Sequence, residues 1–190
     1  MTIETASATH TILTEYASIP ISFTVTSAFS MAGTADASLL EREETVVRPY
    51  VKDYDAVSDR PTDWPGRFDT SRWVLFLATD GGRRVGGAAV AARTAGLDML
   101  EGRDDLAVLW DIRVVLSHRR RGVGQLLFNA AETWALAHGC RELKVETQNV
   151  NVAACRFYAA QGCQLRVIRP NAYADCPGEA QLLWYKSLHT

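Results

Sequence analysis

A segment near the middle of the chain combines arginines with closely spaced glycines. It lies between an apolar stretch and a pattern of helical period, and it reads Val114-Val115-Leu116-Ser117-His118-Arg119-Arg120-Arg121-Gly122-Val123-Gly124. Glycine lets a backbone approach a ligand closely, and the first N–H groups of a helix point outward with the positive end of the helix dipole. The arginines add fixed positive charge. The segment therefore predicts a site for a phosphate or pyrophosphate group.

Two common phosphate-binding fingerprints do not fit this segment. Leu127 stands three residues after Gly124, where the dinucleotide-binding fingerprint has Gly or Ala, and no Walker lysine is present. The pattern therefore disfavours a simple dinucleotide-binding enzyme and a P-loop enzyme.

Two carboxylates interrupt apolar stretches that have the character of strands. Asp111 lies within residues 106–115, and Glu146 follows Leu143-Lys144-Val145. A carboxylate on a buried strand is costly unless it is paired or functional. Either residue can accept the proton of an ammonium group, directly or through water, and either can be a salt-bridged structural acid. Glu146 can also bind an amine, because strand alternation places it on one face with Lys144 and Gln148.

The remaining pattern predicts one mixed sheet with helices. The turn Asp80-Gly81-Gly82 between two apolar runs indicates a hairpin. Strands are expected at 21–26, 73–78, 84–92, 106–115, 143–147, 164–168 and 181–188, and helices at 123–137 and 151–161. Residues 1–20 have no clear period and suggest a loosely held arm, and residues 31–69 suggest irregular structure with short helical turns. The order of elements predicts an α+β fold, a three-layer α/β domain.

Composition narrows the class of protein further. The 190 residues are 47% hydrophobic with a net charge of -2, which suits one domain over 21–190 after an arm at 1–20 and excludes a disordered chain. The start has no basic region followed by an apolar run, and the run at 73–78 is far shorter than the roughly 20 residues of a membrane span, so we expect a cytoplasmic protein. The four cysteines lack metal-ligand spacing and are expected to be reduced packing thiols, with no metal.

Two motifs resemble those of the GNAT superfamily, the acetyl-CoA-dependent N-acetyltransferases. Residues 119–124 resemble that family's R/Q-x-x-G-x-G/A pyrophosphate loop, and residues 151–163 resemble its N-x-x-A-x-x-x-Y-x-x-x-G-F segment, with Cys163 in place of Phe. The resemblance covers roughly residues 70–188. It implies the GNAT fold, a mixed and mostly antiparallel central sheet flanked by helices, with an acetyl-CoA-binding core at about 106–163 and an acceptor side at about 21–70.

The resemblance also implies roles for individual residues in a direct transfer without an acyl-enzyme. Contacts to acetyl-CoA are implied for the backbone at the end of a central strand, the basic loop and the second helix: Arg113, Val114, Val115, Arg119, Arg120, Arg121, Gly122, Val123, Gly124, Asn151 and Tyr158. Tyr158 would donate a proton to the leaving sulfur, since a phenol with a pKa near 10 is a suitable acid for a thiolate. Glu146 and Asp111 are the candidates for the general base.

A narrower resemblance concerns the acceptor. Residues 146–155 are similar to the E-T-Q-x-x-N-x-P-A-C stretch of the streptothricin acetyltransferases, with Ala153 in place of Pro, and residues 49–54 are similar to their P-Y-x-K-D-Y segment. Between residues 36 and 69, acids outnumber bases by nine to five: Asp36, Glu41, Glu43, Glu44, Asp53, Asp55, Asp59, Asp63 and Asp69. This bias suits a cationic amine such as streptothricin with its β-lysine chain, and it also suits a solvated acidic loop.

Other functions stay open at this point. The acceptor can be a protein or peptide lysine, a polyamine or an aminoglycoside instead of streptothricin. A non-catalytic acyl-CoA-binding regulatory module is a further alternative. A nucleic-acid binder is disfavoured, because the chain has one compact arginine cluster and few lysines. The expected partner is therefore a small-molecule amine, without nucleic acid or membrane, and a homodimer stays open because many GNAT proteins form dimers.

Overall fold

The computed structural model describes residues 1–31 and 43–189, and these residues fall into two units. The first unit comprises Met1–Ser22, Asp53–Leu143 and the C-terminal residues from Leu188, and the second comprises Phe23–Lys52 and Lys144–Ser187. Each unit therefore contains part of the predicted acceptor side and part of the predicted acetyl-CoA core.

Antiparallel strands form the sheet of the first unit. Their order is β1-β4-β5-β6, with bounds β1 (Thr2–Ser7), β4 (Val74–Asp80), β5 (Arg83–Ala92) and β6 (Leu106–Val114). The predicted hairpin is confirmed, because β4 and β5 are joined by a turn in which Gly81 and Gly82 have positive φ angles. The register of β5 and β6 shifts between Ala89 and Val90, opposite the stretch of β6 that contains Asp111.

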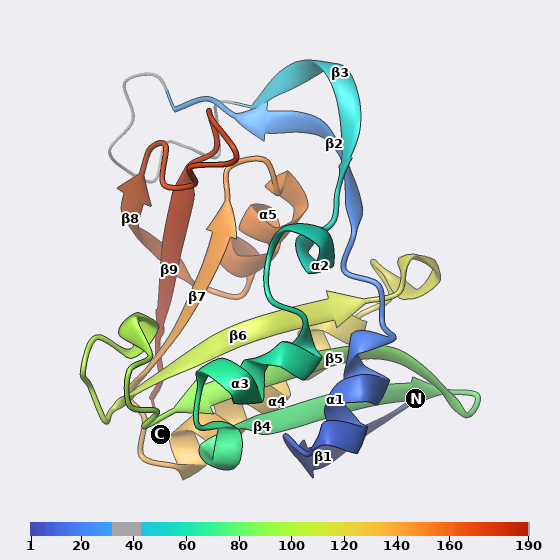
Figure 1. Cartoon of the computed structure of the whole chain (residues 1–190), viewed down its shortest axis with the longest axis vertical. Helices are drawn as coiled ribbons and strands as arrows, with labels where there is room; N and C mark the ends of the chain where they lie inside the picture. Colours follow the sequence, from blue (N-terminus) through green and yellow to red (C-terminus); the bar gives the residue numbers. More distant parts are fainter. Residues whose placement is uncertain (32–42, 190) are drawn as a thin grey trace. The chain divides into compact units, whose positions relative to one another are not determined.

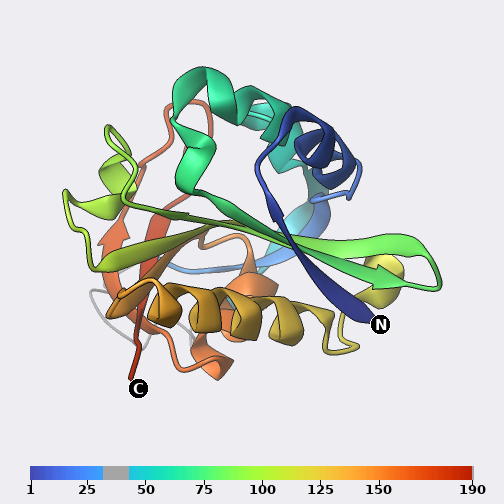
Figure 2. The ribbon, with the colours of Figure 1, turned by 90° about the horizontal axis from the view of Figure 1, so that it is seen from below.

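Helices cover both faces of this sheet. Figure 2 shows α4 (Val123–Ala137) along one face, and α1 (His10–Ala17) and α3 (Trp64–Arg67) over the other. The predicted helical period is confirmed in α4, whose buried side chains are Val123, Leu127, Phe128, Ala131 and Ala135. The short helical elements of this unit are α2 (Tyr54–Val57), η2 (Pro61–Asp63), η3 (Thr70–Arg72), η4 (Asp98–Leu100) and η5 (Leu116–His118).

Two glycines of β5 allow the helices to pack closely on the sheet. A Cβ atom on Gly87 would lie 2.6 Å from the Tyr16 ring of α1. A Cβ atom on Gly86 would lie 3.0 Å from a methyl group of Val123 in α4 and 3.0 Å from the Arg113 carbonyl oxygen. The sequence Gly86-Gly87 thus fixes how near Tyr16 and the start of α4 come to the strands that carry the candidate site.

The second unit contains a two-stranded sheet, three further strands and a helix. The strands β2 (Phe23–Phe29) and β3 (Glu43–Lys52) pair antiparallel. In sheet order β7 (Glu142–Gln148), β9 (Gln181–Ser187) and β8 (Gln164–Arg169) are neighbours, and Figure 1 shows them side by side. The helix α5 (Val152–Ala160) has Asn151 as its N-cap, and the predicted helix at 151–161 is therefore confirmed.

The mixed α/β class with a mostly antiparallel sheet is confirmed, and two regional predictions are wrong. Residues 2–7 and 10–17 form β1 and α1 instead of a loose arm, and β1 pairs with β4 over its whole length. Residues 43–52 form β3, although the stretch 31–69 suggested irregular structure. Pro49 argued against a strand in the sequence, because proline is found in strands chiefly at sheet edges. The helices found in residues 1–31 and 43–189 include none with the length and apolar character of a membrane span.

Candidate active site

The basic loop of the first unit has the backbone geometry of an anion cradle. Gly122 is the N-cap of α4 with a φ of 83°, and Arg120 has a φ of 59°. Among residues 1–31 and 43–189, no side chain hydrogen-bonds to this helix N-terminus as a cap. The first N–H groups of a helix, together with its dipole, favour an anion at such a position. Arg120 and Arg121 are exposed. Backbone donors and exposed cationic groups therefore lie together at the start of α4.

Arg119 holds this loop in place. Its Nε donates to the Val114 carbonyl oxygen at 2.9 Å, and its second guanidinium nitrogen donates to the Ser22 carbonyl oxygen at 2.8 Å. Burial lowers the pKa of Arg119. The Val115 N–H is also engaged, at 2.9 Å from the Val85 carbonyl oxygen. The guanidinium of Arg119 thus anchors the loop, and the charge presented to a ligand comes from Arg120 and Arg121.

Arg113 is the centre of a buried ionic cluster in the first unit. All five of its N–H donors are used: Nε and one terminal N–H bind Asp111, two bind Asp55 and one binds the Ile19 carbonyl oxygen, at 2.7–3.1 Å. Its side chain is 1% exposed. Burial opposes the charge of Arg113, but the charge and hydrogen bonds of Asp111 outweigh burial and raise its pKa.

Tyr16 completes the ionic cluster. Its hydroxyl donates to Asp111 Oδ1 at 2.5 Å, and the Arg113 guanidinium lies 4.9 Å from the centre of its ring. Burial and then the charge of Asp111 raise the pKa of Tyr16, so the hydroxyl stays protonated as a donor. Asp111 is therefore a salt-bridged acid whose oxygens accept from the Tyr16 hydroxyl and the Arg113 guanidinium. Its position in the sequence allowed either this structural role or that of a general base.

Glu146 has a different environment in the second unit. Its Oε1 accepts from the Tyr173 hydroxyl and its Oε2 accepts from the Gln181 amide, both at 2.7 Å. Gln148 donates to the Tyr173 oxygen at 3.0 Å, so Glu146 and Gln148 share a face of β7 as strand alternation predicts. None of the ion pairs found among residues 1–31 and 43–189 includes Glu146. Its two oxygens accept hydrogen bonds from neutral donors.

The two residues predicted on the second motif lie on α5. Asn151 caps this helix, because its side-chain oxygen accepts from the Ala154 N–H at 3.1 Å. Tyr158 lies about two helical turns after the cap. It is 4% exposed, and its ring contacts that of Phe157 edge to face. Capping of α5 is by itself a sufficient structural reason for an asparagine at position 151. The roles of Asn151 and Tyr158 in binding a cofactor stay predictions.

The acidic bias has largely local causes in the described residues. Asp36 and Glu41 lie outside the described residues. Six of the other seven acids cap short helices, accept from nearby backbone, or pair with arginines: Glu43, Asp53, Asp55, Asp59, Asp63 and Asp69. For example, hydrogen bonds from Ser71 lower the pKa of Asp69. The acid count is therefore weak support for a cationic acceptor.

Comparison with known proteins places the chain in a family. The model of the Acetyltransferase (GNAT) family matches residues 39–163, about two thirds of the chain. The chain belongs to the GNAT family. This GNAT chain is 36% identical to a streptothricin acetyltransferase of Escherichia coli over 142 residues, which cover 73% of this chain and 71% of that protein.

Two further relatives of this GNAT acetyltransferase have related descriptions. Streptothricin acetyltransferase A of Bacillus subtilis (strain 168) is 26% identical over 145 residues, covering 75% of this chain and 76% of that protein. A Bacillus anthracis (strain Ames) protein assigned as a streptothricin acetyltransferase, crystallised with acetyl coenzyme A, has a TM-score of 0.71 at 21% identity, covering 98% of this chain and 99% of that chain. At 21% identity, the similarity to this crystal structure shows that the two chains share the GNAT fold and shows nothing about the acceptor.

Proposed function

We propose that this GNAT protein transfers an acetyl group from acetyl-CoA directly to a primary amine of a small cationic acceptor, and that the acceptor is streptothricin. The observation that carries the acceptor is the 36% identity to the Escherichia coli streptothricin acetyltransferase. The role that follows is antibiotic resistance. The four cysteines are free thiols, which suits a reducing compartment, and we place the reaction in the cytoplasm.

The basic loop fits the pyrophosphate of acetyl-CoA. Backbone amides of residues 121–124 sit at an uncapped helix N-terminus, Arg120 and Arg121 are exposed, and Arg119 fixes the loop. When bound, acetyl-CoA supplies the acetyl group as a thioester. The Val114 carbonyl and the Val115 N–H are engaged in hydrogen bonds within the protein. The predicted contact to the pantetheine arm would therefore use other backbone groups of Arg113, Val114 and Val115.

Glu146 is the better candidate for the general base. Asp111 is held by a fully engaged guanidinium and a hydroxyl, and proton uptake would break that buried ion pair. Glu146 is half-buried, accepts only from neutral donors and has no cation paired with it among the described residues, so it is the carboxylate proposed to take the proton of the acceptor ammonium. Tyr158 then supplies the proton that the departing sulfur needs.

Replacing Gly122 by valine should weaken the binding of coenzyme A about ten-fold or more. A side chain at φ 83° costs about 1–2 kcal/mol, and relief of that strain would turn the amides of the cradle away from the phosphates. Titration calorimetry with coenzyme A measures the effect. Gly96→Val is the matched control, since Gly96 has a φ of 74°, open space around its Cβ position and a place outside the loop. Equal affinity of the Gly122→Val and Gly96→Val proteins would refute the cradle.

A panel of amines tests the acceptor. Release of the coenzyme A thiol is followed with streptothricin, an aminoglycoside, a polyamine and a lysine peptide at equal acetyl-CoA. We expect streptothricin to have the highest kcat/KM. A higher kcat/KM for the peptide would indicate a protein acetyltransferase, and tight acetyl-CoA binding with turnover of none of the amines would indicate a regulatory module.

A further inference from the structure

The residues around Glu146 form two chains of hydrogen bonds that end on its carboxylate. In one chain, the Gln148 amide donates to the Tyr173 hydroxyl oxygen at 3.0 Å, and the Tyr173 hydroxyl donates to Oε1 at 2.7 Å. In the other, the Arg169 guanidinium donates to the Gln181 side-chain oxygen at 3.1 Å, and the Gln181 amide donates to Oε2 at 2.7 Å. Both donors are therefore oriented by a further residue.

This arrangement orients the carboxylate of Glu146 and leaves it able to accept further hydrogen bonds. Each carboxylate oxygen has lone pairs for more than one hydrogen bond, so a single neutral donor on each oxygen leaves accepting capacity. Charge-assisted hydrogen bonds to an ammonium group are stronger than those between neutral groups. Glu146, Tyr173 and Gln181 are all half-buried, so solvent reaches them while screening is reduced.

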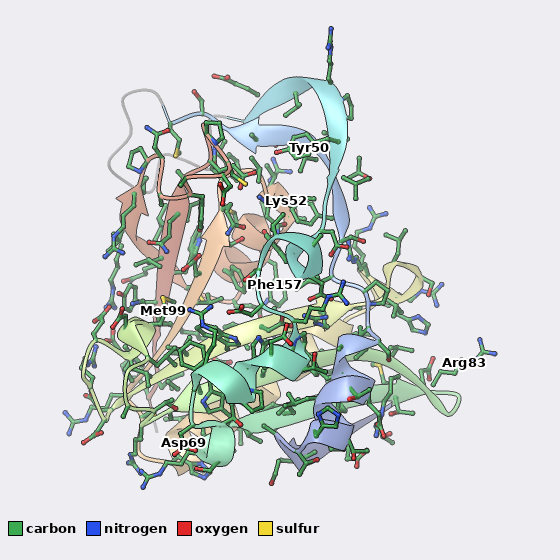
Figure 3. The ribbon with its side chains drawn as sticks, viewed as in Figure 1. Tyr50, Lys52, Asp69, Arg83, Met99 and Phe157 are labelled. Carbon is green, nitrogen blue, oxygen red and sulfur yellow. The ribbon has the colours of Figure 1, made fainter. Side chains whose placement is uncertain are left out.

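The loop that carries Tyr173 is fixed at its far end. Glu179 forms an ion pair with Lys52 at 2.7 Å, and both side chains are 8% exposed; Lys52 and its neighbour Tyr50 lie on β3 (Figure 3). Burial opposes the charge of Lys52, but the hydrogen bond and charge of Glu179 raise its pKa. The next residue, Ala180, donates its N–H to the buried Asn149 side chain at 2.8 Å. The loop 170–180 is thus anchored to β3 and to the end of β7.

We propose that Glu146 binds the ammonium group of the acceptor and that Tyr173 and Gln181 are positioning residues that aim its carboxylate. The inference rests on the proposed function and adds the acceptor subsite to it. It also identifies the loop 170–180 as a determinant of acceptor choice, because this loop places Tyr173 and, through Glu179, is held on β3.

A double-mutant cycle on Tyr173→Phe and Glu146→Gln tests this subsite. Binding of streptothricin is measured by calorimetry in the presence of coenzyme A, which carries no acetyl group, and kcat and KM are measured where turnover permits. Tyr173→Phe should raise the streptothricin Kd and KM about ten-fold while the coenzyme A Kd stays unchanged. In the Glu146→Gln background the same substitution should change the streptothricin Kd less than two-fold, because Tyr173 acts through Glu146.

The control and the contradicting results separate this inference from the proposed function. Tyr185→Phe removes the hydroxyl of a different tyrosine of the second unit, which is buried, and should leave the streptothricin Kd unchanged. If Tyr173→Phe has the same effect with and without the Glu146 carboxylate, or no effect, the positioning role is wrong although streptothricin is still acetylated. If the wild-type protein acetylates no amine, the proposed function fails and the subsite falls with it.

Discussion

Replacing Tyr158 by phenylalanine is expected to lower kcat about 10²–10⁴-fold. The substitution removes the proton that the leaving sulfur needs and keeps the aromatic ring, which is 4% exposed and packs against Phe157. Coenzyme A affinity and thermal stability should stay close to those of the wild type, because the role proposed for the hydroxyl is proton donation in the transfer step and the substitution keeps the ring. Steady-state kinetics with the best acceptor of the panel, together with a coenzyme A titration, measure both effects.

Tyr185→Phe is the matched control for Tyr158→Phe. Tyr185 is 6% exposed and belongs to the same unit, on β9, without an assigned role in the reaction. Its loss of a hydroxyl should change kcat less than three-fold. A Tyr158→Phe protein with wild-type kcat would remove Tyr158 from the role of general acid, and an equal loss in both proteins would assign the effect to packing.

Replacing Arg113 by methionine is expected to destabilise the protein by about 3–5 kcal/mol. The methionine fills much of the same space but leaves Asp111 and Asp55 as partly buried carboxylates without their cation; their side chains are 10% and 20% exposed. For a chain of this length the melting temperature should fall by about 6–20 °C. Thermal and chemical unfolding followed by circular dichroism measure the change.

Two comparison proteins isolate the buried charge as the cause. Arg83→Met alters an exposed arginine at the β4–β5 turn (Figure 3), and we expect a change within about 0.5 kcal/mol. Adding Asp111→Asn and Asp55→Asn to Arg113→Met should restore much of the lost stability, because the uncompensated charges are then gone. A triple variant no more stable than Arg113→Met would show that packing, not charge, makes Arg113 important.

Local patterns predicted the elements that carry the site. The basic loop and the start of α4 could be predicted because their signal is contiguous: arginines, Gly122 and the periodic apolar residues of α4 lie within one stretch of chain. The binding of an anion there stays a prediction. A contiguous signal also predicted α5, where Asn151 is the cap and Gly162 with a φ of 80° follows the end. Such features depend on neighbours in sequence, and sequence shows these directly.

The partners of the two carboxylates could not be predicted, because they come from distant parts of the chain. Asp111 accepts from Tyr16, which is 95 residues away, and Glu146 accepts from Tyr173 and Gln181. Asp55 joins the ionic cluster through Arg113, from which it is 58 residues away. The sequence contained one indirect signal for Tyr16, its helical spacing from Leu13. In the structure both side chains are fully buried on α1. The pair of Asp111 and Arg113 could have been predicted, because side chains two residues apart in a strand lie on the same face and these two have opposite charges.

The central claim is that this GNAT protein acetylates streptothricin with acetyl-CoA, and mass spectrometry of that reaction tests it most directly. Streptothricin, acetyl-CoA and the protein are incubated together, and the product is fragmented to locate the added group. We predict one acetyl group on an amine of the β-lysine chain for each coenzyme A thiol released, and neither product when the protein is omitted. Unmodified streptothricin after prolonged incubation, with or without thiol release, would contradict the claim.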